Sequence, residues 1–117
     1  SGKEALLSVE ARVKMINEIF KDVPSVTANS FKGLTVDFCK KVKANYMLRG
    51  IRTTSDFDYE RAIAQVNKKM LPDVESIFLL TSPEHTPINS TIIRDIIRNG
   101  GDAAQFLPSG IDINNYL

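Results

Sequence analysis

The sequence predicts an α/β protein in which helices cover both faces of a parallel sheet. Three observations lead to this prediction. Segments with helical periodicity alternate along the chain with short strand-like segments. The clearest strand is continuously apolar at Ile77-Phe78-Leu79-Leu80, which is typical of a strand buried on both faces. Helical segments separate the predicted strands, and this order is typical of parallel sheets.

Length and charge restrict the classes of protein to which the chain can belong. With 117 residues it has the size of one globular domain, and we expect a single domain that covers residues 1–117. Its 15 Lys and Arg residues are balanced by 14 Asp and Glu residues, so the net charge is +1. A chain with this balance has no general attraction for nucleic acid or for an anionic membrane, and we expect neither as a partner.

Composition also limits the location and the metal chemistry. No apolar run approaches the ~18 residues of a membrane span, and the first residues lack the apolar segment of a signal peptide. We therefore expect a cytoplasmic protein. Because Cys39 is the one cysteine and His85 the one histidine, a protein-bound zinc site is nearly excluded, whereas Mg²⁺ held by carboxylates or by a substrate stays possible.

The first half of the chain is expected to contain two helices and a short strand. Ser8 can cap a helix whose apolar residues recur at helical spacing over 9–20, and Pro24 is expected to stop it. A short strand is expected around Val26. A second helix is expected over 34–42, where apolar residues recur at every fourth position.

The middle of the chain is expected to form a strand and a long helix. The strand is expected over 46–48, and the following residues, 49–54, have turn character. Ser55 or Asp56 can cap a helix that continues to about Met70.

The last part is expected to form a strand, a loop and a helix. The strand is expected over 76–81 and the loop over 82–89. Asn89 or Ser90 can cap the next helix, and Asn99-Gly100-Gly101 is a strong signal for its end.

Basic side chains follow the first strand of the predicted sheet. Ligands of parallel sheets bind outside the carboxyl ends of the strands, so the loops at 49–54 and 82–89 are the expected ligand side. In the first loop Arg49 and Arg52 flank Gly50, at which a ligand can approach the backbone. Guanidinium groups suit phosphate because they donate two parallel hydrogen bonds. The alternative is a pair of exposed arginines without a ligand.

The second loop also has residues that can receive an anion. Free backbone N–H groups and hydroxyls at Ile88-Asn89-Ser90-Thr91 can form an anion site, although simple helix capping explains the same residues. His85 can stack on a base or transfer a proton, or it can be an ordinary exposed side chain. Glu60 and Asn67 share a helix face that either meets a ligand or is solvated. The basic run 40–43 is interpreted as a solvated helix face rather than a nucleic-acid patch.

Longer motifs then follow one another along the chain. They are Val9-Glu10-Ala11-Arg12, Gly33-Leu34-Thr35-Val36-Asp37-Phe38, Tyr46-Met47-Leu48-Arg49-Gly50-Ile51-Arg52, Asp56-Phe57-Asp58-Tyr59-Glu60, Ala64-Gln65-Val66-Asn67-Lys68-Lys69, Glu75-Ser76-Ile77-Phe78-Leu79-Leu80-Thr81-Ser82-Pro83-Glu84, Ile88-Asn89-Ser90-Thr91, Gly101-Asp102 and Phe106-Leu107-Pro108. In this order they resemble the family of bacterial phosphopantetheine adenylyltransferases over essentially the whole chain. The resemblance implies a Rossmann-like fold of the nucleotidyltransferase type.

The resemblance also implies a reaction and its partners. The family transfers an adenylyl group from ATP to 4′-phosphopantetheine, which gives dephospho-coenzyme A and pyrophosphate. Mg²⁺ bound with ATP is the implied cofactor. A homohexamer and feedback by coenzyme A are implied as well.

Roles for single residues come from the same resemblance. Arg49, Thr35 and Lys3 are expected to bind phosphopantetheine, and Lys3 and Arg52 are expected to be catalytic. The expected ATP contacts are Gly50, Ile51, Arg52, Glu60, His85, Thr86, Pro87, Ile88, Asn89, Ser90 and Thr91. We expect Arg52 and the Asn89–Thr91 turn to lie on the same side of the molecule.

The chain departs from the family pattern in two places. The family's N-terminal strand–helix unit, with its Gly-x-Phe-Asp-Pro-x-Thr-x-Gly-His segment, has no counterpart in these 117 residues, and the expected sheet is therefore thin. A fragment, an incomplete sequence and a short non-catalytic product are the three explanations, of which the intact later motifs favour the first two. The alternative function is a non-catalytic fragment, or a nucleotide-binding or assembly module of the same fold. Ile88-Asn89-Ser90-Thr91 replaces the usual Ile-Ser-Ser-Ser and keeps its capping ability.

Overall fold

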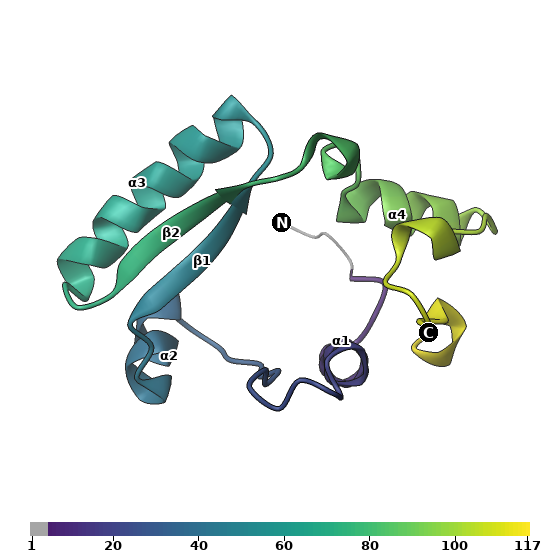
Figure 1. The fold of residues 1–117 in the computed structure, drawn as a ribbon, viewed down its shortest axis with the longest axis horizontal. Helices are drawn as coiled ribbons and strands as arrows, with labels where there is room; N and C mark the ends of the chain where they lie inside the picture. Colours follow the sequence, from purple (N-terminus) through teal and green to yellow (C-terminus); the bar gives the residue numbers. More distant parts are fainter. Residues whose placement is uncertain (1–4) are drawn as a thin grey trace. The chain divides into compact units, whose positions relative to one another are not determined.

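The computed structural model describes residues 5–117, which form an α/β structure (Figure 1). Its helices and strands are α1 (Val9–Ile19), α2 (Thr35–Val42), β1 (Tyr46–Ile51), α3 (Thr54–Met70), β2 (Glu75–Leu80) and α4 (Ser90–Arg98), with short 3-10 turns at Pro83–His85, Ala104–Phe106 and Ile113–Asn115. The chain divides into two compact units. One unit is Phe31–Pro87, and the other joins the residues up to Ser30 to Ile88–Leu117. The single domain expected over 1–117 stays a prediction.

Strands β1 and β2 pair in parallel, as predicted. Tyr46 lies opposite Glu75, and the register continues to Ile51 opposite Leu80. Beyond the last pair, the backbone N–H of Thr81 donates to the carbonyl of Ile51 at 2.8 Å. Both strands therefore end at the same edge of the sheet, which is the edge where parallel sheets bind ligands.

Helix α3 packs against one face of this strand pair (Figure 1). The Phe57 ring on α3 meets the Phe78 ring on β2 edge to face, with centroids 6.1 Å apart. On the opposite face, Ile77 and Leu79 keep 44% and 57% of their surface exposed. The α/β class with a parallel sheet is confirmed, but the complete burial expected for the apolar strand is not found in the unit Phe31–Pro87.

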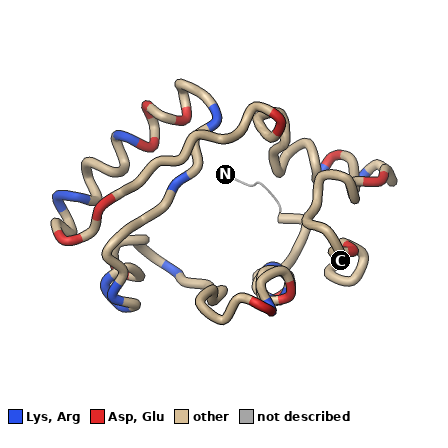
Figure 2. Tube along the Cα trace, in the orientation of Figure 1, with Lys and Arg blue, Asp and Glu red and all other residues tan. Residues whose placement is uncertain are grey.

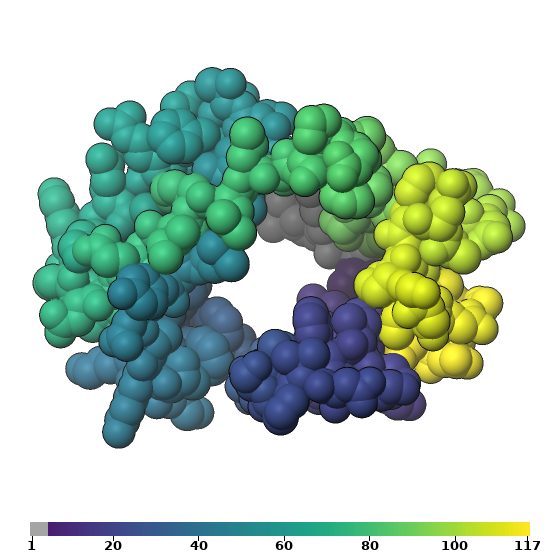
Figure 3. All heavy atoms as spheres, viewed as in Figure 1, coloured from purple at the N-terminus to yellow at the C-terminus, as the bar shows by residue number. Residues whose placement is uncertain are grey.

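The start of α3 differs from its predicted start. Thr53, rather than Ser55 or Asp56, caps the helix, because its hydroxyl oxygen accepts a hydrogen bond from the Asp56 N–H at 3.1 Å. At the other end the helix finishes at Met70, as predicted, and Lys68 there binds the Pro72 carbonyl and the Glu75 carboxylate. The acidic residues of α3 lie in the first half of the helix, and Lys68 and Lys69 lie in its last turn (Figure 2). The space-filling view shows the atoms of α3 against those of β2 (Figure 3).

The prediction of a strand around Val26 is wrong. The Val23 N–H donates to the carbonyl of Phe20 at 2.9 Å, and the Val26 N–H donates to that of Val23 at 3.0 Å. These successive turns use the backbone groups that a strand would offer to a neighbour. In the described residues the sheet therefore has two strands rather than the three expected. Helix α1 also ends at Ile19, ahead of Pro24.

The predicted helix signals in the other unit are confirmed. The Ser8 hydroxyl oxygen accepts from the Ala11 N–H at 3.0 Å, which caps α1. At the end of α4 the N–H groups of Gly100 and Gly101 reach back to the carbonyls of Ile97 and Ile96, at 3.1 and 2.8 Å. This is the Schellman motif, and the φ angle of +76° at Gly100 explains the glycine there.

None of the helices in residues 5–117 has the length and the apolar character that a membrane crossing requires.

Candidate active site at the carboxyl edge of the sheet

The two arginines of the predicted ligand loop lie at the end of β1. The sequence places both in a turn, and this is wrong for Arg49 because β1 continues through Arg49, Gly50 and Ile51. Pairing with β2 holds this segment straight, since Arg49 lies opposite Phe78 in the parallel ladder. Arg49 is therefore fixed on the strand, whereas Arg52 is the first residue after it.

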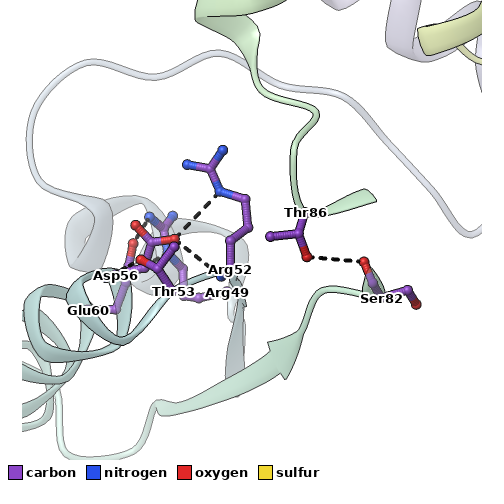
Figure 4. Close-up of polar contacts among 7 residues, drawn as sticks. All are labelled: Arg49, Arg52, Thr53, Asp56, Glu60, Ser82 and Thr86. Carbon is purple, nitrogen blue, oxygen red and sulfur yellow. Dashed lines mark hydrogen bonds and ion pairs between the residues drawn. The ribbon is translucent and has the colours of Figure 1, made fainter. Parts of the chain in front are cut away.

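Arg49 forms a two-point ion pair with Glu60 on α3 (Figure 4). Its Nε donates to Oε2 of Glu60 at 3.0 Å, and its Nη2 donates to Oε1 at 2.7 Å. The Glu60 side chain is only 13% exposed and that of Arg49 is 54% exposed. This geometry fits the planar fork of a guanidinium to both carboxylate oxygens.

The ion pair shifts the titration of both partners. The hydrogen bond from Arg49 lowers the pKa of Glu60 from its ordinary value, against the opposing effect of burial. The same hydrogen bond raises the pKa of Arg49. Both groups are therefore charged at neutral pH.

A pocket of about 290 Å³ lies beside this pair. It brings together Thr35 from the start of α2, Arg49 from β1 and Glu60 from α3, all three of which the sequence analysis selected. Its other lining residues are Met47, Leu48, Ile63, Ala64, Asn67, Ser76 and Phe78. Half of the lining residues are polar and half are apolar, which suits a small-molecule ligand that carries both kinds of group.

Most of the apolar lining was missed at the sequence level. The helix contributes positions 60, 63, 64 and 67, which is one stripe of an α-helix. Residues two apart on the strands, 47 and 49 on β1 with 76 and 78 on β2, share the face that this stripe covers. Helical and strand periodicity together could have identified these residues once the parallel register was known.

A second ion pair stands one helical turn before the first. The Nε of Arg52 lies 3.5 Å from Oδ2 of Asp56, and the same oxygen accepts from the Arg52 backbone N–H at 3.2 Å (Figure 4). Asp56 and Glu60 are four residues apart on α3, so they share one face of the helix. Two guanidiniums from the end of β1 are thus each held by one carboxylate of α3.

Gly50 and Ile51 offer a ligand different groups. A Cβ added at Gly50 would meet no heavy atom of the described residues within 4 Å, so the backbone there is accessible. The Ile51 side chain is buried, with 6% of its surface exposed. A ligand contact at Ile51 is therefore restricted to its main chain.

Comparison with known proteins shows the family to which the chain belongs. The family model described as cytidylyltransferase-like matches residues 1–96. The phosphopantetheine adenylyltransferase of Flavobacterium psychrophilum is 46% identical over 111 residues, which cover 95% of this chain and 73% of that protein. The protein of the same name from Lachnoclostridium phytofermentans is 42% identical over 111 residues, covering 95% and 68%. That from Bacteroides thetaiotaomicron is 42% identical over 113 residues, covering 97% and 74%. The chain belongs to the phosphopantetheine adenylyltransferase family.

Membership of the phosphopantetheine adenylyltransferase family confirms the resemblance and the nucleotidyltransferase fold type. The relatives carry the name of an enzyme, which does not favour the alternative of a non-catalytic module. The roles of single residues are tested neither by these comparisons nor by the fold, and they stay predictions.

The remaining predicted site residues lie in the second loop and near the chain start. His85 ends the Pro83–His85 turn with its side chain 64% exposed, and the Thr86 hydroxyl donates to the Ser82 carbonyl at 3.4 Å (Figure 4). Lys3 lies outside the described residues.

The rest of that loop starts α4. Asn89 caps the helix, since its Oδ1 accepts from the Ile92 N–H at 3.0 Å, as predicted. Because Ile88 to Thr91 belong to one unit and Arg52 to the other, their expected proximity stays a prediction. Within residues 5–117 there is no cluster of three or more His, Cys, Asp or Glu residues that could hold a metal ion.

The Arg49–Glu60 pair predicts a pH dependence of stability. Because the folded-state pKa of Glu60 lies below its ordinary value of 4.5, the unfolded chain binds more protons between the two values. The pair's contribution is therefore complete above the ordinary value and is lost as the pH falls through the folded-state pKa. We expect urea titrations of the native protein and Glu60→Gln to differ at pH 7 and to converge in acid. A difference that is constant with pH would contradict this expectation.

Proposed function

We propose that the protein transfers the adenylyl group of ATP to the phosphate of 4′-phosphopantetheine, giving dephospho-coenzyme A and pyrophosphate. An oxygen of the phosphopantetheine phosphate attacks the α-phosphorus of ATP. The bond from that phosphorus to the bridging oxygen breaks, and pyrophosphate leaves. One observation carries the proposal: in a member of this family, Arg49 lines a pocket and Arg52 follows three residues later at the carboxyl end of the same strand. The two guanidiniums suit two phosphate groups that must meet.

The pocket is the proposed site of phosphopantetheine. Arg49 binds its phosphate, and Thr35 lines the space for the pantetheine arm. Asn67 adds a side-chain amide that can hydrogen-bond the amides of that arm, while Ile63 and Phe78 supply apolar contact. Lys3 is proposed as a further ligand of the reacting phosphates on the resemblance alone.

ATP is proposed to bind beyond the end of β1. Arg52 neutralises charge on the triphosphate, and the backbone at Gly50 and Ile51 is the proposed contact surface. The proposed contacts from the second loop are His85, Thr86, Pro87, Ile88, Asn89, Ser90 and Thr91. Catalysis is then positioning together with charge neutralisation, as in other transfers at phosphorus. Lys3 and Arg52 are the proposed catalytic residues, and Mg²⁺ enters bound to the triphosphate as part of the substrate.

The test measures pyrophosphate release by the full-length protein. With ATP and Mg²⁺, we expect release only when 4′-phosphopantetheine is added, together with dephospho-coenzyme A in equal amount. Pantetheine without its phosphate is the matched control and is expected to give no release. Release that does not depend on phosphopantetheine, or nucleotide binding without any release, would overturn the proposal.

Gly50→Ala is expected to weaken ATP binding without affecting folding. The structure leaves room for the added methyl group, so the melting temperature is expected to stay within a few degrees of the native value. The methyl group would nevertheless stand where the proposed ligand approaches the backbone, and KM for ATP is expected to rise by roughly five- to tenfold. The control is the KM for phosphopantetheine, which should not change. An unchanged KM for ATP would remove Gly50 from the proposed site.

Location, assembly and regulation are proposed from the family resemblance. A cytoplasmic location fits an enzyme that consumes ATP for coenzyme A synthesis. A homohexamer and feedback by coenzyme A are the corresponding proposals for assembly and control. Light scattering of the purified protein and titration of the activity with coenzyme A test them.

A further inference from the structure

Asp56 and Glu60 share one face of α3, and each carboxylate lies beside the Nε of one arginine. Glu60 receives the Nε–H of Arg49 and one N–H of its Nη2. Asp56 lies 3.5 Å from the Nε of Arg52. The carboxylates are one helical turn apart, and the arginines are three residues apart at the end of β1 (Figure 4). Each guanidinium is therefore engaged at its Nε edge.

This arrangement leaves the outer fork of Arg49 for a ligand. A guanidinium has five N–H groups, and Glu60 takes one from Nε and one from Nη2. Both N–H groups of Nη1 and the second one of Nη2 are not used by Glu60. These groups form a second planar fork, which can bind two oxygens of one phosphate.

Glu60 cannot increase the attraction of the site for phosphate, since its own charge is negative. Its contribution must come from holding Arg49 in one orientation. A free arginine side chain loses rotational freedom when it binds a phosphate, whereas a side chain already held by two hydrogen bonds has lost that freedom beforehand. The low exposure of Glu60 keeps it from turning away to solvent.

We propose that Glu60 is a positioning residue that acts through Arg49 on phosphopantetheine, and that Asp56 acts in the same way through Arg52 on ATP. This assignment rests on the proposed function and differs from the direct ATP contact that the family resemblance implies for Glu60. Each oxygen of Glu60 accepts one hydrogen bond from Arg49, which is the contact that the assignment uses. In this proposal each carboxylate positions one arginine, and each arginine binds one of the two substrates.

The test is the pattern of KM values in two isosteric variants of the full-length protein. Glu60→Gln keeps the shape of the side chain but removes one acceptor oxygen and the charge. We expect it to raise KM for phosphopantetheine about tenfold and to leave KM for ATP within about twofold. Asp56→Asn is expected to show the reverse pattern. Asp58→Asn removes an exposed carboxylate between them on α3 and is the matched control, with no change in either KM.

Each other outcome overturns the assignment. A KM for phosphopantetheine that falls in Glu60→Gln would show that the carboxylate acts by repulsion. A rise in KM for ATP alone would show a direct nucleotide contact. Equal rises in both KM values, or a loss of affinity for both substrates that follows the melting temperature, would show a structural role. Glu60→Asp separates a structural role from a positioning role, because it keeps the charge that holds Arg49. Native protein that makes no dephospho-coenzyme A would refute the proposed function itself, independently of these variants.

Discussion

Arg52→Ala is expected to lower kcat/KM for ATP by roughly 10- to 100-fold. A hydrogen bond to a charged group contributes about 1.5–3 kcal/mol, and each 1.4 kcal/mol corresponds to a factor of about ten in rate. Arg52 stands directly after β1, at the edge where ligands of parallel sheets bind. Because Arg52 is proposed to neutralise charge on the triphosphate, we expect the variant to have both a higher KM for ATP and a lower kcat. Initial rates of pyrophosphate release at varied ATP measure this effect.

The fold is expected to tolerate this substitution. Asp56 loses the guanidinium but keeps the hydrogen bond from the backbone N–H of residue 52, and its side chain is 33% exposed and can be solvated. Arg61→Ala is the matched control, because Arg61 lies on the same helix and does not line the Arg49–Glu60 pocket. It is expected to leave kcat/KM for ATP unchanged. An Arg52→Ala protein with native kinetics would remove Arg52 from the ATP site.

Helix boundaries were predictable where side chains act on their own backbone. The caps at Ser8 and Asn89 and the glycine stop after α4 were predicted correctly. In these cases the stabilising hydrogen bond joins residues three to five positions apart, so the sequence pattern contains both partners. The parallel pairing of β1 with β2 was also predictable, because a helix separates two apolar strands.

The errors arise where distant residues decide the structure. Arg49-Gly50 has turn character by itself, yet the ladder with β2 extends β1 through Ile51. Thr53 then becomes the first residue that can cap α3, two positions before the predicted cap. The strand expected around Val26 fails for the opposite reason, since local turns use its backbone groups. Strand propensity alone does not supply a partner strand.

The candidate site, like the fold, was predictable only in part. The arginines could be selected from residue type and position in the chain. Their carboxylate partners could not be assigned, because the pairing of Arg49 with Glu60 depends on where β1 ends and on the rotation of α3 above it. The sequence analysis noted that Glu60 and Asn67 share a helix face, and the structure places both in the Arg49 pocket.

Arg49→Ala is expected to raise KM for phosphopantetheine by about 100-fold or more. The variant loses the two hydrogen bonds that the outer fork of the guanidinium can donate to a phosphate, and it leaves the charge of Glu60 close to that phosphate. Arg49→Lys is expected to recover little, because an ammonium group cannot hold Glu60 at two points and a phosphate at two more. KM for ATP is expected to change far less. Initial rates at varied phosphopantetheine measure these effects.

Combining Arg49→Ala with Glu60→Gln separates the two causes of this loss. Since Glu60 is proposed to act only through Arg49, Glu60→Gln should add no further loss once Arg49 is absent. Removal of the unpaired negative charge should instead recover part of the affinity, so that the double variant has a lower KM for phosphopantetheine than Arg49→Ala alone. Independent losses that multiply in the double variant would mean that Glu60 contacts a substrate directly, and Arg49 would then hold the phosphate without a positioning partner.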